Sequence, residues 1–230
     1  MAEYAATFDS RWEDIYKSGQ QLNCYPYSDV VSFIHKYHDR TRLKSKTKVL
    51  EIGCGAGNNL WFAARAGFDV TGIDASSSAI EFARNRFSQE NLHGDFTVGN
   101  FCQLPYPSGS FDIVIDRCAM TNVGRADAMR TIAEVNRVLC EGGLFFSHVL
   151  GADGRTDRVV SEDDLAEYQD DQKGFSVKVR LYDESKIREL WGPSWRLHDL
   201  TEITRQSILD AHRLVFWQVI AKKIALAATG

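Results

Sequence analysis

Three glycines stand at alternate positions, Gly53, Gly55 and Gly57, directly after the β-prone run 49–52. This order is typical of a buried strand that runs into a glycine turn and then into a helix. Side chains at these positions would block a ligand lying against the backbone, and the helix that follows would offer it free N–H groups. The stretch therefore predicts a site for a nucleotide-like cofactor, although glycines alone do not say which one.

Two carboxylates narrow the choice of cofactor. The spacing is Gly-x-Gly-x-Gly, not the Gly-x-Gly-x-x-Gly of the dinucleotide fingerprint, and Glu51 lies two positions before the first glycine. A carboxylate there would repel a pyrophosphate but attract the ammonium and sulfonium groups of S-adenosylmethionine (SAM). Asp74 ends a second strand-like run, 70–73, at about 20 residues from the loop, where a carboxylate can meet two ribose hydroxyls.

In these features the chain resembles the class I, seven-stranded SAM-dependent methyltransferases, and in particular the small-molecule group within them. The resemblance covers residues 45–150 and rests on five segments in family order: 49–60, 71–75, 98–105, 110–116 and 139–144. It implies SAM as the cofactor and S-adenosylhomocysteine (SAH) as the product. At Asn100 the family commonly carries Asp. An amide oxygen can still accept from the adenine amino group, so we expect a changed affinity and not a lost site.

The resemblance also implies which residues bind the cofactor. We expect these to be Tyr16, Glu51, Gly53, Cys54, Gly55, Asn58, Asn59, Asp74, Ala75, Ser76, Asn100, Phe101, Asp116 and Arg117.

Methyl transfer from a sulfonium is an in-line displacement, so the reactants must be held in line, close together and dry. In an open parallel sheet this happens outside the carboxyl ends of the strands, which here selects Asp116 to Cys118 and Ser147-His148. We predict two catalytic residues, His148 and Asp116. His148 could be a general base toward a hydroxyl, or a structural histidine. Asp116 could contact the cofactor ammonium, act as a base, or pair with Arg117.

Residues of the N-terminal linker 19–27 and of the strand ends are candidates for binding the substrate, because this linker is rich in amide and aromatic groups. The predicted set is Tyr16, Gln20, Asn23, Tyr25, Arg117, His148 and Arg205. No metal is expected. A metal-assisted subclass of the family has an Asp-Asn pair where this chain has Ser147-His148, so the carboxylate and amide oxygens that Mg²⁺ prefers are missing.

The amino-acid composition limits the classes of partner that this protein is expected to bind. The 230 residues include 27 basic and 31 acidic side chains, a net charge of −4, and no basic stripe marks a nucleic-acid footprint. No apolar run has the length of a membrane span, and the first residues lack a signal-peptide pattern. The five cysteines are scattered without metal-site spacing. We expect a cytoplasmic monomer or homodimer that acts on a small molecule, without nucleic acid or membrane.

From residue 47 onward the pattern alternates between strand and helix, which predicts an α/β fold: a doubly wound, mostly parallel seven-stranded sheet, its last strand antiparallel, with helices on both faces. The expected strands are 47–52, 69–73, 95–98, 111–116, 143–149 and an antiparallel pair, 195–203 and 213–221; the expected helices are 58–66, 77–87, 126–139 and 183–191.

Two segments stand apart from this alternation. Residues 1–44 precede it and are predicted to form an N-terminal helical lid on the SAM-binding domain 45–230; the alternative is a helical hairpin packed on the sheet edge. Residues 151–175 contain little apolar material and read as an insertion or lid loop that caps a substrate pocket.

The leading functional hypothesis is a SAM-dependent methyltransferase acting on a small polar acceptor, such as a hydroxyl of a sugar or another metabolite. Three alternatives stay open. They are a methyltransferase directed to nitrogen, sulfur or phosphate, an NAD(P)-dependent oxidoreductase, and a non-catalytic SAM-binding regulatory protein.

Overall fold

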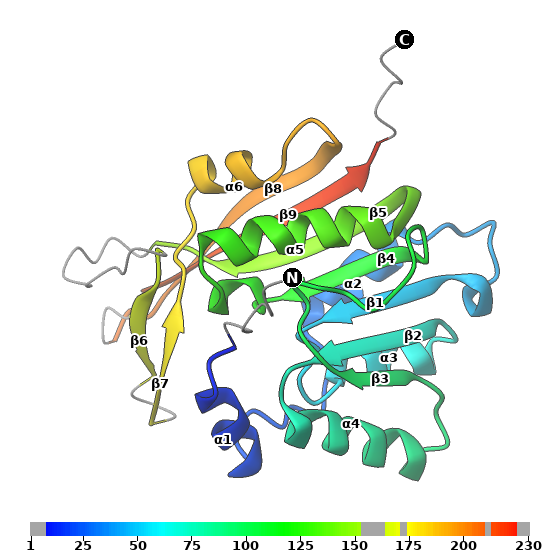
Figure 1. Cartoon of the computed structure of the whole chain (residues 1–230), viewed down its shortest axis with the longest axis horizontal. Coiled ribbons are helices and arrows are strands. Elements are labelled where there is room, and N and C mark those ends of the chain that lie inside the picture. The colour runs from blue at the N-terminus through cyan, green and yellow to red at the C-terminus, as the bar shows by residue number, and fades with distance from the viewer. Residues whose placement is uncertain (1–7, 153–163, 171–173, 210–212, 225–230) are drawn as a thin grey trace, which may run out of the picture.

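A computed structural model describes residues 8–152, 164–170, 174–209 and 213–224 of the chain (Figure 1). The helices are α1 (Arg11–Lys17), α2 (Ser28–Tyr37), α3 (Asn58–Arg65), α4 (Ser77–Gln89), α5 (Arg125–Val138) and α6 (Glu184–Leu190), with short 3₁₀ turns at Lys44–Lys46 and Met120–Asn122. The strands are β1 (Lys48–Ile52), β2 (Asp69–Asp74), β3 (Asp95–Val98), β4 (Phe111–Arg117), β5 (Leu139–Leu150), β6 (Ala166–Asp170), β7 (Phe175–Val179), β8 (Trp195–Gln206) and β9 (Arg213–Lys223).

Seven strands form one sheet in the order β3-β2-β1-β4-β5-β9-β8. The five strands from β3 to β5 are parallel, and the last strand, β9, runs antiparallel to both β5 and β8. This confirms the predicted fold class. Because the order reverses between β1 and β4, the carboxyl ends of these two strands lie on either side of the switch point, where ligands of such sheets bind.

Helices cover both faces of the sheet, so its strands are apolar at successive positions instead of alternating. On one face, α2, α3 and α4 pack on side chains such as Val49, Ile113 and Phe146. On the other, α5 and α6 pack on Leu50, Val114 and Phe145, and α5 lies across the near face in Figure 1. Neighbouring residues of one strand thus point into opposite cores.

The N-terminal helices do not form a hairpin. The apolar side of α2, with Val30, Phe33 and Ile34, is buried in the core beside α3. By contrast, α1 lies at the carboxyl edge of the sheet, where it contacts α4 and β7. Only α1 therefore has the position of a cover, whereas α2 is part of the packed domain.

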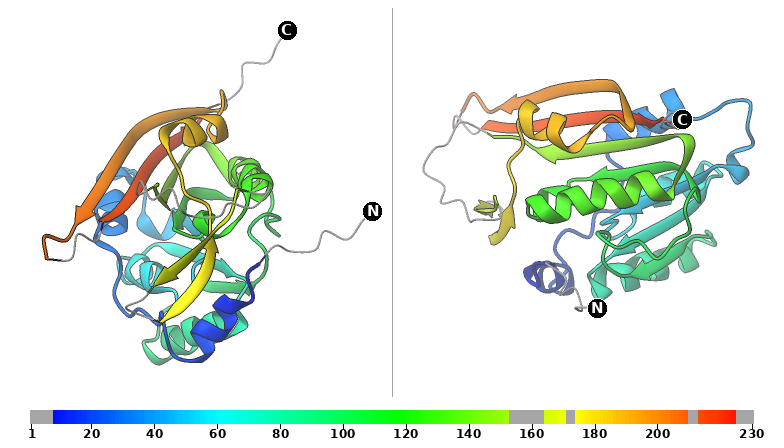
Figure 2. Two further views of the ribbon diagram at one scale, coloured as in Figure 1. Left: turned by 90° about the vertical axis from the view of Figure 1, so that its left-hand side faces the viewer. Right: turned by 45° about the horizontal axis from the view of Figure 1, so that its top comes forward.

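The predicted insertion, 151–175, contains one strand, β6, and the next strand, β7, begins at its last residue. Strands β6 and β7 pair antiparallel as a separate two-stranded sheet, while residues 153–163 and 171–173 of the predicted segment lie outside the described residues. Both views in Figure 2 and the view in Figure 1 show this pair beside α1, beyond the ends of the parallel strands. The chain thus brings two distant segments to the same edge of the sheet.

The start of β5 differs from the expected strand 143–149. The helix ends at Val138, and β5 already begins at Leu139, so Gly142 lies inside the strand with φ of +77°. The register of β4 against β5 shifts at this point, from Phe111 opposite Leu139 to Ile113 opposite Leu144. The glycine pair therefore marks an irregularity in the strand and not its start. No helix in the described part of the chain is long and apolar enough to span a membrane.

Candidate functional site

A cavity of about 430 Å³ opens at the carboxyl edge of the sheet. Its floor is the glycine loop between β1 and α3, in which Gly53, Gly55 and Gly57 have φ of +59°, +50° and +73°. A Cβ on Gly53 would lie 2.2 Å from the Cβ of Ala119, and one on Gly55 would lie 2.4 Å from the Tyr16 hydroxyl oxygen. The loop needs glycine for its backbone conformation and for this close approach.

Asp74, at the end of β2, holds the loop in place. Its Oδ2 accepts from the Gly55 N–H and its Oδ1 from the Ser76 N–H, each at 2.8 Å. The carboxylate is buried but lines the cavity. Burial raises its pKa above the ordinary value, and the backbone hydrogen bonds act in the opposite direction. Each oxygen keeps a further lone pair that can accept from a ligand hydroxyl.

Glu51 is a second buried carboxylate on the cavity wall, 2% exposed. Its Oε1 accepts from Asn59 Nδ2 at 2.7 Å, while its Oε2 is buried and has no hydrogen-bond partner among the described residues. Burial raises the pKa of Glu51 to about 8. An unpaired buried carboxylate oxygen is costly, and this one has the chemistry to accept a donor or a cation.

Two asparagines at the start of α3 tie the linker to the loop. Asn58 Nδ2 donates to the Tyr25 carbonyl at 2.9 Å, and Asn59 Oδ1 accepts from the Tyr27 N–H at 3.0 Å. Both side chains line the cavity, as do most other residues predicted to bind cofactor. Those are Tyr16, Gly53, Cys54, Ala75, Asn100, Phe101 and Arg117.

Ser76 and Asp116, also predicted to bind cofactor, are absent from the cavity lining. The Ser76 hydroxyl oxygen accepts from the Ala79 N–H and so caps α4. Asp116 is fully buried, where it accepts from the Ala119 and Met120 N–H groups and from the Ser147 hydroxyl. Burial raises its pKa to about 6. These hydrogen bonds indicate that Asp116 stabilises the turn after β4. This position does not favour the predicted catalytic role of Asp116.

His148 is likewise buried and outside the cavity lining, so it does not reach the space in which an acceptor would lie. Its Nδ1 hydrogen-bonds to Asp29 Oδ2, and its Nε2 has no partner among the described residues. Burial lowers its pKa, against the effect of Asp29. This geometry favours the structural alternative for His148. Asp29 belongs to no recognisable motif, and it was not among the site residues predicted from the sequence.

The residues predicted to bind substrate separate into two groups. Tyr16, Asn23, Arg117 and Arg205 line the cavity. Gln20 and Tyr25 are exposed and lie outside the lining, with Tyr25 78% exposed. The linker therefore contributes through Asn23, whose Nδ2 donates to the Tyr27 hydroxyl at 3.0 Å, and through Tyr27 itself.

One wall of the cavity is apolar and aromatic, and sequence reasoning missed it. Its residues come from α1, from β5, β7 and β9, and from the linker: Trp12, Tyr27, Leu150, Phe175, Val177, Val179, Leu214 and Phe216. The only available signal was the alternation in β7, where Val177 and Val179 are buried and Lys178 between them is exposed. This short strand begins at the last residue of the predicted loop 151–175, and no strand was predicted there.

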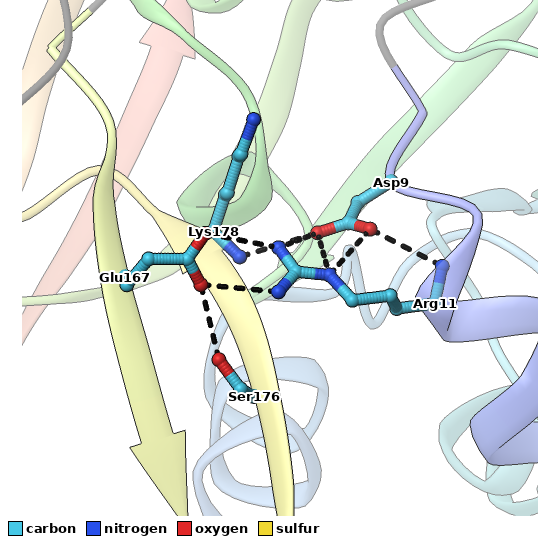
Figure 3. A network of polar contacts seen from close by, with 5 residues as sticks. All are labelled: Asp9, Arg11, Glu167, Ser176 and Lys178. Carbon is cyan, nitrogen blue, oxygen red and sulfur yellow. Dashed lines mark hydrogen bonds and ion pairs between the residues drawn. The ribbon is translucent and has the colours of Figure 1, made fainter.

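A polar network joins α1 to the β6–β7 sheet above this wall (Figure 3). Arg11 Nε donates to both carboxylate oxygens of Asp9, at 2.9 and 3.0 Å, and its Nη1 donates to Glu167 Oε2 at 3.0 Å. Glu167 also accepts from the Ser176 hydroxyl, and Asp9 accepts from the Lys178 N–H. We name α1 together with β6 and β7 the cover of the cavity.

Glu13 attaches the cover to the domain. Its carboxylate accepts from the hydroxyls of Ser76 and Ser78, at 2.5 and 2.6 Å, and from the Ser77 hydroxyl and the Ser78 N–H at the start of α4. These hydrogen bonds lower the pKa of Glu13 to about 2. A carboxylate at a helix N-terminus is also favoured by the helix dipole.

Within the described ranges, no group of three or more His, Cys, Asp or Glu side chains is arranged so that it could hold a metal ion.

Comparison with known proteins gives consistent matches. Residues 49–143 match a family described as a methyltransferase domain. Squalene methyltransferase 1 of Botryococcus braunii is 37% identical over 111 residues, which are 46% of this chain and 29% of that protein. The chain thus spans less than a third of that relative.

Solved structures share the fold. A SAM-dependent methyltransferase from Methanosarcina mazei has a TM-score of 0.73 and 22% identity, over 88% of this chain and 100% of that one. The 1,6-didemethyltoxoflavin-N1-methyltransferase of Burkholderia thailandensis, solved with 1,6-didemethyltoxoflavin and SAH bound, has a TM-score of 0.69 and 16% identity, over 98% of this chain and 93% of that one.

Proposed function

Because residues 49–143 match a methyltransferase domain and the chain has the fold of a SAM-dependent methyltransferase, we propose that it transfers a methyl group from SAM to a small molecule with an apolar body. The observation that carries the proposal is one cavity with two kinds of wall. One wall is polar and consists of the glycine loop, Glu51 and Asp74; the other is apolar and is formed partly by the cover.

The polar wall fits the cofactor. The unpaired Glu51 Oε2 suits the ammonium group of SAM, and the two oxygens of Asp74 suit the ribose hydroxyls. Gly53 and Gly55, which have no side chains, line the floor of the cavity. Asn100 and Phe101 line the cavity where the family binds adenine. Bound SAM supplies a methyl group activated by the sulfonium.

The chain's own contribution is placement and exclusion of water. The cover closes over both walls and is fixed by Glu13 and by the Arg11 network. A displacement in a closed, dry space is faster because charges at the reacting atoms are less screened and the reactants are held together.

The apolar wall changes the expected acceptor. A sugar would leave its hydroxyls against Val177, Val179 and Leu214 without partners, which is unfavourable. An aromatic or aliphatic body suits these side chains better. Because His148 does not line the cavity, we also favour an acceptor atom that needs no general base, such as a neutral nitrogen, a sulfur or an already ionised oxygen. Squalene, which the name of one relative gives as its acceptor, is apolar, and this supports an acceptor of low polarity.

The test is mass spectrometry of a metabolite extract incubated with the protein and methyl-labelled SAM. We expect a labelled product whose formation needs the protein and is inhibited by SAH. Tight SAM binding without any labelled product would favour the non-catalytic alternative, and absence of SAM and SAH binding would overturn the proposal. We further propose a cytoplasmic monomer or homodimer without a nucleic-acid partner, which size-exclusion chromatography and a nucleic-acid binding assay would check.

A further inference from the structure

We propose that Arg117, held in position by Asp29 and His148, is a carboxylate-binding group of the cavity. The inference rests on the proposed function, because the carboxylate would belong either to the amino-acid end of SAM or to the acceptor. Arg117 ends β4, and its side chain is only 12% exposed yet lines the cavity. Burying a guanidinium costs free energy unless its charge is paired, so a side chain this deep in a protein is expected to pair with protein groups or with a ligand.

The guanidinium is held on several sides. Its Nε forms an ion pair with Asp29 Oδ2 at 3.1 Å, and its Nη1 donates to Cys118 Sγ at 2.8 Å. Its central carbon lies 4.2 Å from the ring centre of Tyr27 and 5.7 Å from that of Phe216. These contacts come from α2, the linker and β9, and from the residue that follows β4. The side chain therefore loses little freedom when it binds a ligand.

Asp29 is itself fixed by the buried His148, which hydrogen-bonds through Nδ1 to the same Oδ2 that pairs with Arg117. Burial alone would raise the pKa of Asp29, but the hydrogen bond from His148 and the charge of Arg117 lower it below its ordinary value. Asp29 stays ionised and keeps Arg117 oriented. His148 thus acts as a positioning residue, in place of the general base that the sequence suggested.

Arg117 keeps unused hydrogen-bond donors. Its Nη2 makes no hydrogen bond to the residues that the structure describes, and its Nε, although ion-paired with Asp29, is buried without a hydrogen bond among them. The surrounding rings of Tyr27 and Phe216 lower the local polarity, which strengthens a charge-assisted hydrogen bond from these donors. A carboxylate is the ligand group that a guanidinium pairs with best, together with phosphate.

The first arm of the test compares SAM with decarboxylated SAM, which keeps the sulfonium and the ammonium and lacks only the carboxylate. If Arg117 binds the cofactor, calorimetry should show that the wild type prefers SAM by about 10- to 100-fold. Arg117→Gln should remove this preference while leaving decarboxylated SAM unaffected. Arg188→Gln, an exposed arginine of α6, serves as the control and should keep the preference.

The second arm uses protein saturated with SAH and the probes phenylacetate and phenylacetamide. If Arg117 binds the acceptor, the acid should bind at least about tenfold more tightly than the amide, and Arg117→Gln should abolish the difference without changing the SAH affinity. Asp29→Asn should weaken the carboxylate preference in whichever arm shows it, an effect that mere loss of stability would not produce. If neither arm shows a carboxylate preference that depends on Arg117, in protein that binds SAM, the inference is wrong. Failure to bind SAM at all would instead overturn the proposed function.

Discussion

At the scale of single residues, the two carboxylates of the cavity, Glu51 and Asp74, differ in how many of their oxygens accept a hydrogen bond. Both oxygens of Asp74 already accept backbone N–H groups, whereas one oxygen of Glu51 has no partner among the described residues. The pKa of Glu51 is correspondingly high, about 8, because of burial. Between its ordinary pKa and about 8 the folded state binds more protons at this site than the unfolded chain. The contribution of Glu51 to stability therefore falls as the pH rises through that window.

A cationic ligand should reverse this protonation. We predict that near neutral pH the binding of SAM releases a proton from Glu51 to the buffer, because an ammonium beside the carboxylate favours its ionised form. Calorimetry in two buffers of different ionisation enthalpy measures the release. Glu51→Gln should lose it, and 5′-methylthioadenosine, which lacks the ammonium, should not cause it in the wild type. An equal release from Glu51→Gln would show that another group titrates.

Asp74 gives a second prediction. Asp74→Asn removes the charge and turns an NH₂ toward one of two backbone N–H donors, Gly55 or Ser76. We expect the affinity for SAH to fall about 10- to 100-fold, since hydrogen bonds to a charged acceptor contribute about 1.5 to 3 kcal/mol. Calorimetry measures this, with circular dichroism to show that the variant folds. Asp69→Asn, at the exposed start of β2, should bind normally. Unchanged affinity in Asp74→Asn would remove Asp74 from the proposed site.

At the scale of elements, the cover depends on polar contacts more than on burial. In α1 only Ile15 is buried, and a helix of 7 residues has little stability of its own. Glu13 holds it on the N-terminus of α4, and Arg11 holds it on β6. Such an element belongs to the low-stability end of a protein, which suits a part that must open to admit ligands.

We therefore predict that Glu13→Gln speeds hydrogen exchange in residues 11–17 and raises the dissociation rate of SAH several-fold. The amide keeps one acceptor but loses the charge that binds the serine hydroxyls and the helix end. Exchange in β1 and β4 should stay slow. Asp14→Asn is the matched control, because Asp14 is exposed on the same helix. If both variants behave like the wild type, Glu13 does not attach the cover.

At the scale of the whole molecule, the sheet separates two apolar cores, and the N-terminal segment contributes to one of them. Phe33 of α2 is 2% exposed and packs on Phe146 of β5, with ring centres 5.0 Å apart. Trp12 of α1 packs instead on Phe175 of β7 and lines the cavity. The two aromatic residues lie 21 positions apart in sequence but serve different parts of the protein.

This difference predicts that replacing Phe33 by alanine mainly affects stability, whereas replacing Trp12 by alanine mainly affects ligand binding. Phe33→Ala should lower the free energy of unfolding by about 3 to 5 kcal/mol, the usual cost of removing a large buried side chain. Trp12→Ala should cost much less stability but weaken the binding of apolar acceptors. Urea denaturation followed by circular dichroism checks the first effect, and product formation from labelled SAM checks the second. Equal destabilisation by both variants would mean that α1 is also part of the core.

Much of the fold was predictable because its signals are local. Strand β3 was predicted at its observed bounds, and β1 and β4 within one residue at an end, since apolar runs and glycine turns mark such elements. Prediction was poorer for strands whose position depends on the part of the chain against which they pair or pack. The start of β5 depends on its register with β4, and the pair β6–β7 depends on the apolar wall that Val177 and Val179 complete. Neither is encoded in a short window of sequence.

The family resemblance, the cofactor class and the positions of Glu51, the glycine loop and Asp74 could be inferred from the sequence, because these residues lie within one strand–loop–helix–strand unit whose geometry follows from spacing. The contact between Asp29, Arg117 and His148, and the exclusion of Gln20 and Tyr25 from the cavity, could be learned only from the three-dimensional structure. The physical reason is strand order. Residues 29, 117 and 148 lie on α2, β4 and β5, and their contact exists only after the sheet places β5 beside β4 and packs α2 across them.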